Sequence, residues 1–198
     1  MKLAKAFWIL GNLLVNITIG IYIYLSSKAP VDVVERYSYM NENWSIYAGH
    51  WKAEFVFMTM IAIGAIFFAI NSKKVSWSLI SVGQLISLTL YPLMLGGYNN
   101  TPVELAEMAN QIAIVVFVFG NIVYLGGLIH LYLYDSLLKK WIRFSAVCIA
   151  SLALIAFSIS FMGFISWKQA LIIGPLTNLL FLINAYYGFK INLENMNL

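Results

Sequence analysis

Amide side chains recur near the centres of the long apolar stretches of this 198-residue chain. They are Asn12, Asn16, Gln84, Asn121 and Asn178. Asn12 and Asn16 are one helical turn apart, so they would share one face of a helix. Because an unpaired amide is costly in hydrocarbon, we expect these side chains to point into a helix bundle and away from lipid.

A polar layer of this kind has two alternative uses. Its members could form hydrogen bonds between neighbouring helices, or they could line a pocket or pathway for a neutral or amphipathic small molecule or a lipid. No Asp, Glu, Lys, Arg or His lies near the middle of these stretches, which argues against a proton pump, a proton-coupled carrier and a voltage sensor. The five amides are therefore our candidate ligand-binding residues.

A second candidate is the pair formed by His50 and Glu54. Because they are four residues apart, they can share a helix face and resemble half of a metal site or a catalytic acid/base pair. A catalytic zinc site needs a third protein ligand, and the only other histidine, His130, is predicted on the opposite side of the membrane. The third ligand could come from an outer acidic residue, namely Glu42, Glu104 or Glu107. The alternative is an interfacial anchor, since His, Trp and Lys are common at headgroup depth.

Other chemistries have no motif in the chain. There is no G-x-S-x-G, no H-E-x-x-H and no P-loop. The basic residues are few and divided between two faces, so a nucleic-acid partner is not expected. Cys148 is the single cysteine, which rules out an intramolecular disulfide, and a lone His130 does not make a haem site. We expect no metal and no cofactor, and we favour a non-enzymatic protein.

The composition indicates a membrane protein. Hydrophobic residues make up 62% of the chain and charged residues only 10%, with a mean hydropathy of +0.83, whereas soluble domains carry about 25% charged residues. Six apolar stretches are each long enough to span about 30 Å of hydrocarbon and too long for barrel strands. They cover residues 4–25, 53–71, 75–96, 108–134, 142–165 and 168–190. We therefore predict an all-α fold, a single transmembrane domain over residues 1–198 with six transmembrane helices.

The distribution of charge predicts the orientation. With the N-terminus inside, the cytoplasmic segments hold more basic residues than the outer segments, which is the positive-inside bias. The inner set is Lys2, Lys5, Lys73, Lys74, Lys139, Lys140, Arg143 and Lys190, and the outer set is Lys28, Arg36, Lys52 and Lys168. Both termini are then cytoplasmic, and we expect a multi-pass protein of the plasma (inner) membrane.

The tryptophans all fall near predicted helix ends, where an amphipathic indole lies at headgroup level. The predicted inner ends hold Trp8, Trp77 and Trp141, and the outer ends hold Trp44, Trp51 and Trp167.

The first outer segment, residues 26–52, is predicted to be structured. Residues 30–40 are typical of a short helix, with Asp32 and Arg36 paired at i,i+4 and an apolar face lying on the outer leaflet. That face consists of Val33, Val34, Tyr37 and Met40. Farther along, the run Thr101-Pro102-Val103-Glu104 matches a capping box, which predicts that the fourth helix begins outside the membrane near Thr101.

Three segments of the second half carry a resemblance to known proteins. They are Phe119 to Leu133 (FGNIVYLGGLIHLYL), the basic turn Lys139 to Arg143 (KKWIR), and Gly174-Pro175 with Tyr187 to Lys190 (YGFK). In these segments the chain resembles a family of six-span bacterial integral membrane proteins of unassigned function. The acid that this family carries after the glycine/proline region of the final span is replaced here by Leu176, Thr177 and Asn178. The resemblance implies a six-helix architecture and brings no activity with it.

We therefore predict an integral membrane protein that binds or conducts a neutral or amphipathic small molecule or lipid at the amide layer. One alternative is an enzyme of the outer leaflet that uses His50 and Glu54. The other is an accessory subunit of a membrane complex or a homo-oligomer, in which a glycine stripe such as Gly120 and Gly127 would face a partner. The lipid bilayer is a partner in all three cases.

Overall fold

The structure, a computed structural model, describes residues 2–165, 169 and 171–192, and every regular element in these ranges is helical. The first half contains α1 (Lys2–Lys28), α2 (Val33–Glu42), α3 (Trp44–Ser72), α4 (Val75–Leu88) and α5 (Leu90–Gly97). The second half contains α6 (Val103–Tyr134), α7 (Lys140–Phe161), the short 3-10 helix η1 (Leu171–Ile173) and α9 (Gly174–Lys190). The predicted all-α fold is confirmed for the described residues.

Five stretches in the described part of the chain are long and apolar enough to cross a membrane, and they are compatible with an integral membrane protein. They are α1, α3, α4 with α5, α6 and α7. The last predicted span, 168–190, contains α9, which has 17 residues and rises only about 26 Å. Pro175 in the first turn of α9 starts this helix late, so the count of six spans stays a prediction.

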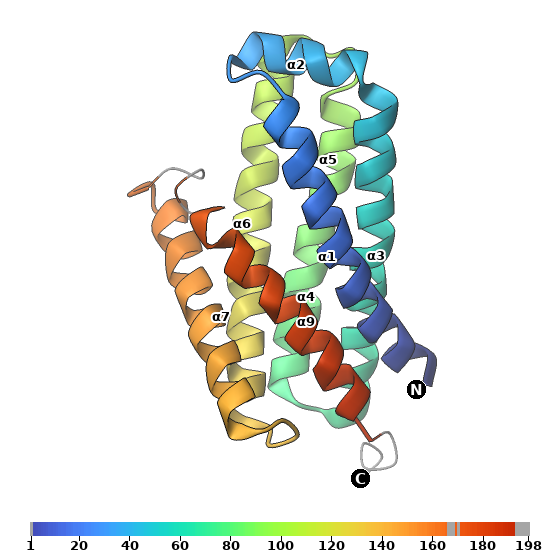
Figure 1. Ribbon diagram of the computed structural model, residues 1–198, viewed down its shortest axis with the longest axis vertical. Helices are drawn as coiled ribbons and strands as arrows, with labels where there is room; N and C mark the ends of the chain where they lie inside the picture. The colour runs from blue at the N-terminus through green and yellow to red at the C-terminus, as the bar shows by residue number, and fades with distance from the viewer. Residues whose placement is uncertain (1, 166–168, 170, 193–198) are drawn as a thin grey trace.

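The long helices run side by side and α2 lies across one end of them (Figure 1). The helix α1 packs against α3 and α9, while α6 packs against α4, α5 and α7. The helices α7 and α9 accompany only the lower part of the bundle, and α9 crosses it obliquely (Figure 1). The start of α1 and the end of α9 lie at the end opposite α2 (Figure 1). We call these two ends the termini end and the α2 end.

The apolar stretch 75–97 is interrupted once, at Thr89. Pro92 follows three residues later, and its nitrogen carries no hydrogen for the carbonyl of Leu88. The missing hydrogen bond divides the stretch into α4 and α5.

Glycines bring α4 and α6 to backbone contact. A Cβ atom on Gly83 would clash with the backbone of Tyr124, and one on Gly127 would lie 2.8 Å from the backbone nitrogen of Ile80. Gly120 faces Gly83 and the next turn of α4 in the same way. The expectation of an outward glycine stripe is therefore wrong for Gly120 and Gly127, because both are used to let α4 approach α6 closely.

Three tryptophans predicted at headgroup level lie in the interior instead. Trp8, Trp51 and Trp77 have exposed fractions of 0%, 1% and 0%. The rings of Trp8 and Trp77 meet edge to face with centroids 4.9 Å apart, and Phe68 packs against both. The interfacial interpretation is wrong for these three, because a residue near a helix end can still face the neighbouring helices.

The remaining tryptophans differ from one another. Trp141 is exposed at the start of α7. Trp44 begins α3, which starts well before the predicted residue 53, and its ring packs against Trp51. Trp167 lies outside the described residues.

The start of α2 uses its charged residues differently from the prediction. Asp32 is the N-cap, and its carboxylate accepts the first-turn N–H groups of Val34 and Glu35 at 2.9 and 3.0 Å. Arg36 donates to carbonyl groups of the preceding loop, including that of Pro30 at 3.0 Å. The predicted Asp32–Arg36 pair is replaced by these two separate sets of hydrogen bonds, because both side chains satisfy backbone groups at the helix start.

The apolar face of α2 is divided between the bundle and the surroundings. Tyr37 and Met40 are buried against the ends of the long helices, whereas Val33 and Val34 are exposed. The ring of Tyr37 lies 5.5 Å from that of Tyr98 at the end of α5. This helix therefore caps the bundle.

The capping box predicted at the start of α6 does not form. Pro102 is the N-cap and makes no side-chain capping bond, while the Thr101 hydroxyl donates to the carbonyl of Asn99 at 3.2 Å. The preceding residue of the loop is held by α2, since the N–H of Asn100 donates to the side-chain oxygen of Asn41 at 3.0 Å. The Thr101 hydroxyl therefore bonds within the loop and is not available to cap α6.

An ion pair joins two turns at the termini end. The Lys74 ammonium donates to the Asp135 carboxylate at 2.8 Å, and the N–H of Leu137 donates to its other oxygen at 2.9 Å. Burial alone would raise the pKa of Asp135, but these hydrogen bonds and the Lys74 charge hold it below its ordinary value.

This pair makes stability depend on pH in one direction. Because the pKa of Asp135 is lower in the folded protein, its contribution is present above the ordinary value of 3.8 and is lost as the pH falls through the folded value. We expect Asp135→Asn to lower the free energy of unfolding by about 1 kcal/mol at pH 7. Thermal unfolding in detergent should show the difference from wild type shrinking below the ordinary pKa. A difference that stays constant down to low pH would contradict this origin.

The contact between α4 and α6 predicts that replacing two glycines by alanine will have different effects on stability. Gly83→Ala places a methyl group against the backbone of Tyr124 and should cost about 1–3 kcal/mol of stability. Gly20→Ala is the control, because a Cβ there meets nothing within 4 Å. Thermal unfolding of both variants in detergent is the measurement, and equal midpoints would show that α4 and α6 do not touch at Gly83.

Candidate functional site

A fully enclosed amide on α9 connects three helices. Asn184 is 0% exposed, and its side-chain nitrogen donates to Asn12 at 3.2 Å and to the Tyr124 hydroxyl at 2.8 Å. The Tyr132 hydroxyl donates to its side-chain oxygen, and the Trp8 indole donates to its backbone carbonyl at 2.7 Å. This Asn184 network satisfies every polar group of the amide, so its arrangement is that of a structural link between α9, α1 and α6.

Sequence analysis missed Asn184, Tyr124 and Tyr132. Asn184 lies in the same apolar stretch as Asn178 but nearer the termini end, and only amides near the stretch centres were considered. An enclosed tyrosine hydroxyl needs a partner as much as an amide does. Counting tyrosines together with amides would have indicated this network.

The five predicted amides divide into separate contacts. Asn12 belongs to the Asn184 network and also donates to the carbonyl of Trp8 at 2.7 Å. Asn16 donates to the backbone carbonyl of Asn178 at 3.0 Å, which ties α1 to α9 a second time. For Asn12 and Asn16 the geometry is that of interhelical hydrogen bonding.

The other amides are less well satisfied. Asn121 donates to the carbonyl of Phe117 on its own helix at 2.8 Å. Gln84 is 2% exposed, and within the described residues its side-chain oxygen has no hydrogen-bond partner. The same is true of the side-chain oxygen of Asn178. A buried acceptor without a donor typically costs about 1–3 kcal/mol, so these two atoms are available to a water molecule or a ligand.

The candidates His50 and Glu54 do lie together. They occupy successive turns of α3, with 3.6 Å between the His50 Nε2 and a carboxylate oxygen of Glu54. This separation is an electrostatic contact and is longer than a hydrogen bond. The side chains are 2% and 18% exposed, respectively, and the Tyr22 ring of α1 stacks on His50 at 5.9 Å with an interplanar angle of 17°. We call these two residues the His50–Glu54 pair.

Aromatic residues pack on α3 next to the pair at the α2 end. Trp51, one residue after His50, lies 5.4 Å from Tyr98 and 5.9 Å from Tyr47, measured between ring centroids. Phe55, one residue after Glu54, lies 5.7 Å from Tyr91 of α5. The residues that follow His50 and Glu54 in the chain are therefore held by aromatic contacts, and the pair itself is largely buried.

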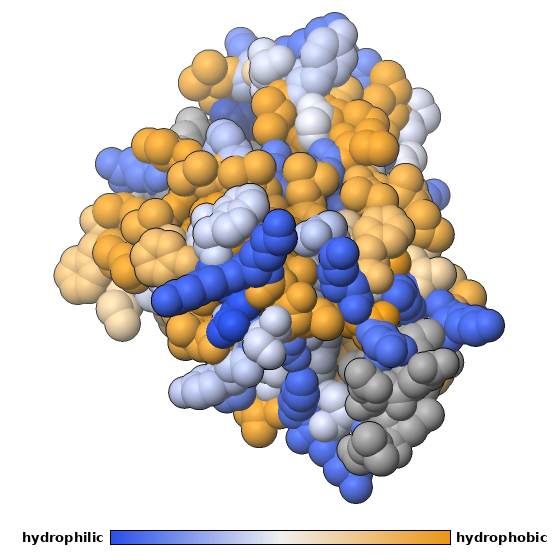
Figure 2. Space-filling view, turned by 60° about the horizontal axis from the view of Figure 1, so that its bottom comes forward, coloured by the Kyte–Doolittle hydropathy of each residue, from blue (hydrophilic) through white to orange (hydrophobic). Residues whose placement is uncertain are grey.

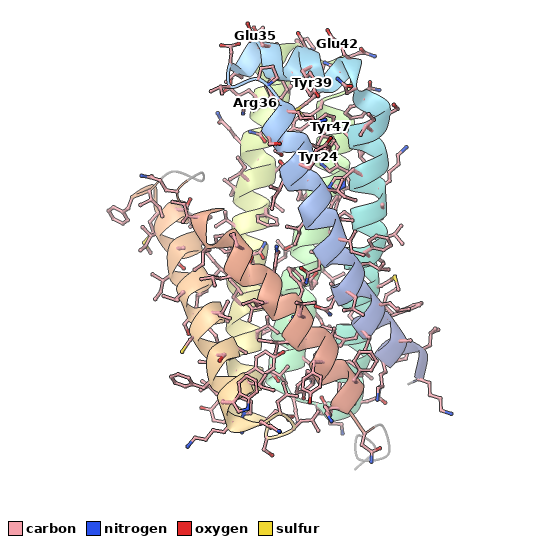
Figure 3. The ribbon with its side chains drawn as sticks, viewed as in Figure 1. Tyr24, Glu35, Arg36, Tyr39, Glu42 and Tyr47 are labelled. Atoms are coloured by element: carbon pink, nitrogen blue, oxygen red, sulfur yellow. The ribbon has the colours of Figure 1, made fainter. Side chains whose placement is uncertain are left out.

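Figure 3 shows how α2 closes this end. Tyr39 and Tyr47 lie beneath it, with their rings 6.5 Å apart, whereas Glu35 and Glu42 lie along its outer side. The two acids are exposed, and they point away from the His50–Glu54 pair. Their carboxyl groups are therefore solvated, whereas that of Glu54 is largely buried.

The pair has neither a metal-site geometry nor a basic counter-ion. Over the residues that the structure describes, no three His, Cys, Asp or Glu side chains come together as metal ligands. The third ligand suggested by Glu42, Glu104 or Glu107 is therefore not in place. Among the described side chains, no Lys or Arg forms an ion pair with Glu54. What the pair offers is a carboxyl oxygen and an imidazole nitrogen side by side, able to receive a hydrogen-bond donor.

Comparison with models of protein families, with curated protein sequences and with solved structures gave no match. The interpretation of the site therefore rests on its geometry.

The Asn184 network predicts unequal effects for two asparagines. Asn184→Leu removes the partner of Asn12, Tyr124 and Tyr132 at once and should cost about 2 kcal/mol or more of stability. Asn121→Leu should cost less than about 1 kcal/mol, because its amide donates only within α6. Thermal unfolding in the same detergent compares the two, and a larger loss for Asn121→Leu would contradict the assignment.

Proposed function

We propose that this protein is a non-enzymatic integral membrane protein that binds a small amphipathic or lipid-like molecule, with its polar head held by the His50–Glu54 pair. The observation that carries this proposal is the condition of the pair. His50 Nε2 is buried and has no hydrogen-bond partner in the described part of the chain, and Glu54 lies beside it without a basic counter-ion. An unsatisfied polar pair is expensive in apolar surroundings and marks a binding site in a membrane protein.

The depth of the pair supports an amphipathic ligand. Glu54 and Ser72, the last residue of α3, are about 27 Å apart along the helix axis. If the Ser72 end marks one side of a hydrocarbon layer of about 30 Å, Glu54 lies just inside the other side. A molecule bound there would keep its apolar part in the membrane and its polar head at the pair.

The exposure of Tyr22, whose ring stacks on His50, supports access from the membrane. The helix α9 begins about halfway up the bundle, so that the upper parts of α1 and α6 are not bridged by it (Figure 1). Tyr22 continues the inward face of α1 that contains Val15 and Thr18, yet it is 41% exposed where those two are buried. A ligand that reached this part of α1 from the bilayer would contact Tyr22 beside His50.

The side-chain oxygens of Gln84 and Asn178 are also buried without a partner in the described chain. They are the part of the predicted amide layer that supports ligand binding or conduction.

The test is native mass spectrometry of protein purified with its own lipids. Wild type should retain a molecule of defined mass, and Glu54→Leu should lose it by about tenfold or more, because the hydrogen bond between the carboxyl group and the ligand's polar head is removed. Glu107→Gln is the control, because it removes an exposed carboxylate on α6. Equal spectra for wild type and Glu54→Leu would refute the proposal.

A further inference from the structure

A cavity with polar side chains on both sides lies at the termini end, far from the His50–Glu54 pair. It is half-open, has a volume of about 220 Å³, and lies between the start of α4 and the last turns of α6. Lys74 and Ser76 line one side of it, and His130, Tyr134 and Asp135 line the other. A water molecule occupies about 30 Å³ in the liquid, so the space is large enough for a small polar group with its hydration.

The free polar groups of this cavity include donors. Ser76 is 2% exposed, and its hydroxyl donates to no residue that the structure describes. The Nδ1 atom of His130 is buried and likewise has no partner among the described residues. The N-cap residue Lys74 supplies no side-chain cap, so the first N–H groups of α4 add to the positive potential.

The acceptors around the cavity are already in use. Both oxygens of the Asp135 carboxylate accept hydrogen bonds, from Lys74 and from the N–H of Leu137. The last carbonyl groups of α6 accept from Arg143, which donates to Tyr132 at 2.9 Å and to Leu133 at 2.7 Å. A ligand that satisfies the cavity must therefore bring acceptors of its own.

The charge of the termini end favours an anion. Figure 2 brings this end forward and shows hydrophilic side chains projecting from it over an apolar surface. The basic residues carried by its helix ends and turns are Lys2, Lys5, Lys73, Lys74, Lys139, Lys140, Arg143 and Lys190. Asp135 is paired with Lys74, so its charge does not offset the remaining cations.

The rim of the cavity is apolar on the membrane side. Val75 and Tyr134 both line the cavity, and they are 61% and 77% exposed. An exposed apolar rim can contact an acyl chain that runs along the helices, whereas a free ion would gain nothing from apolar contacts there.

We propose that this cavity binds the phosphate group of an anionic phospholipid. The phosphate oxygens accept from the Ser76 hydroxyl, from His130 Nδ1 and from the ammonium of Lys74, and the acyl chains lie against Val75 and Tyr134. This site is separate from the His50–Glu54 pair and does not depend on the function proposed for that pair.

The test is native mass spectrometry of the full chain in detergent, titrated separately with phosphatidylglycerol and phosphatidylcholine. We expect wild type to prefer phosphatidylglycerol by about tenfold, and Ser76→Ala combined with His130→Leu to lose about tenfold in its affinity for phosphatidylglycerol. Ser78→Ala is the matched control, because it removes an exposed hydroxyl from the same turn. Lys140→Gln controls for the general charge of this end. Both should stay within about threefold of wild type.

Each outcome bears on the proposal. Equal affinity for the two lipids, unchanged binding by the double variant, or an equal loss in Lys140→Gln would overturn it. Ser76→Ala alone is a mild change at a helix start, so it gives the decisive comparison if His130→Leu does not fold. A third titration uses inorganic phosphate as competitor. Displacement of the lipid by phosphate at millimolar concentration would overturn the lipid as the source and leave a site for free phosphate.

Discussion

The bundle depends on two pairs of helices whose backbones touch. In the first pair, Gly83 lets α4 approach α6. In the second, a Cβ on Gly11 of α1 would lie 2.8 Å from the carbonyl of Phe57, and one on Gly64 of α3 would lie 3.0 Å from that of Ala4. Because apolar burial gives little driving force in lipid, such close contacts are a main source of attraction between membrane helices.

The interior polar groups are satisfied in one part of the bundle and not in others. The Asn184 network joins both helix pairs to α9, and all of its amide groups are hydrogen-bonded. Buried atoms without partners in the described chain lie at both ends, on His50 toward the α2 end and on Trp77 and His130 toward the termini end, and also between them, on Gln84 and Asn178. Since unsatisfied groups of this kind are costly, the places where one lies beside a second polar group, as at His50 and at His130, are those that favour a bound molecule.

Much of the fold could be predicted from the sequence, since the length and hydropathy of a stretch decide whether it forms a long helix. The positions of helix ends and the direction of side chains could not. Trp51 and Trp77 occupy the expected chain positions, yet they face inward, because the facing depends on which neighbour packs there. The capping box at Thr101 failed for a similar reason, since the loop already used its hydroxyl.

The candidate site was predictable only in part. The i,i+4 spacing of His50 and Glu54 placed them on one helix face, which the structure reproduces. Their lack of a third acidic neighbour depends on tertiary packing, which spacing along the chain does not contain. The amide layer was located by depth alone, and depth does not distinguish Asn12, which meets α9, from Asn121, which bonds within its own helix.

The contacts of α2 have a mechanical consequence. Its Asn41 holds the N–H of Asn100, and its Tyr37 packs on Tyr98, so the connection between α1 and α3 is fastened to the connection between α5 and α6. These two contacts hold the connections together above the aromatic rings at the α2 end. A molecule that reached the His50–Glu54 pair from the aqueous side would have to separate these contacts. A molecule that entered from the bilayer would leave them intact.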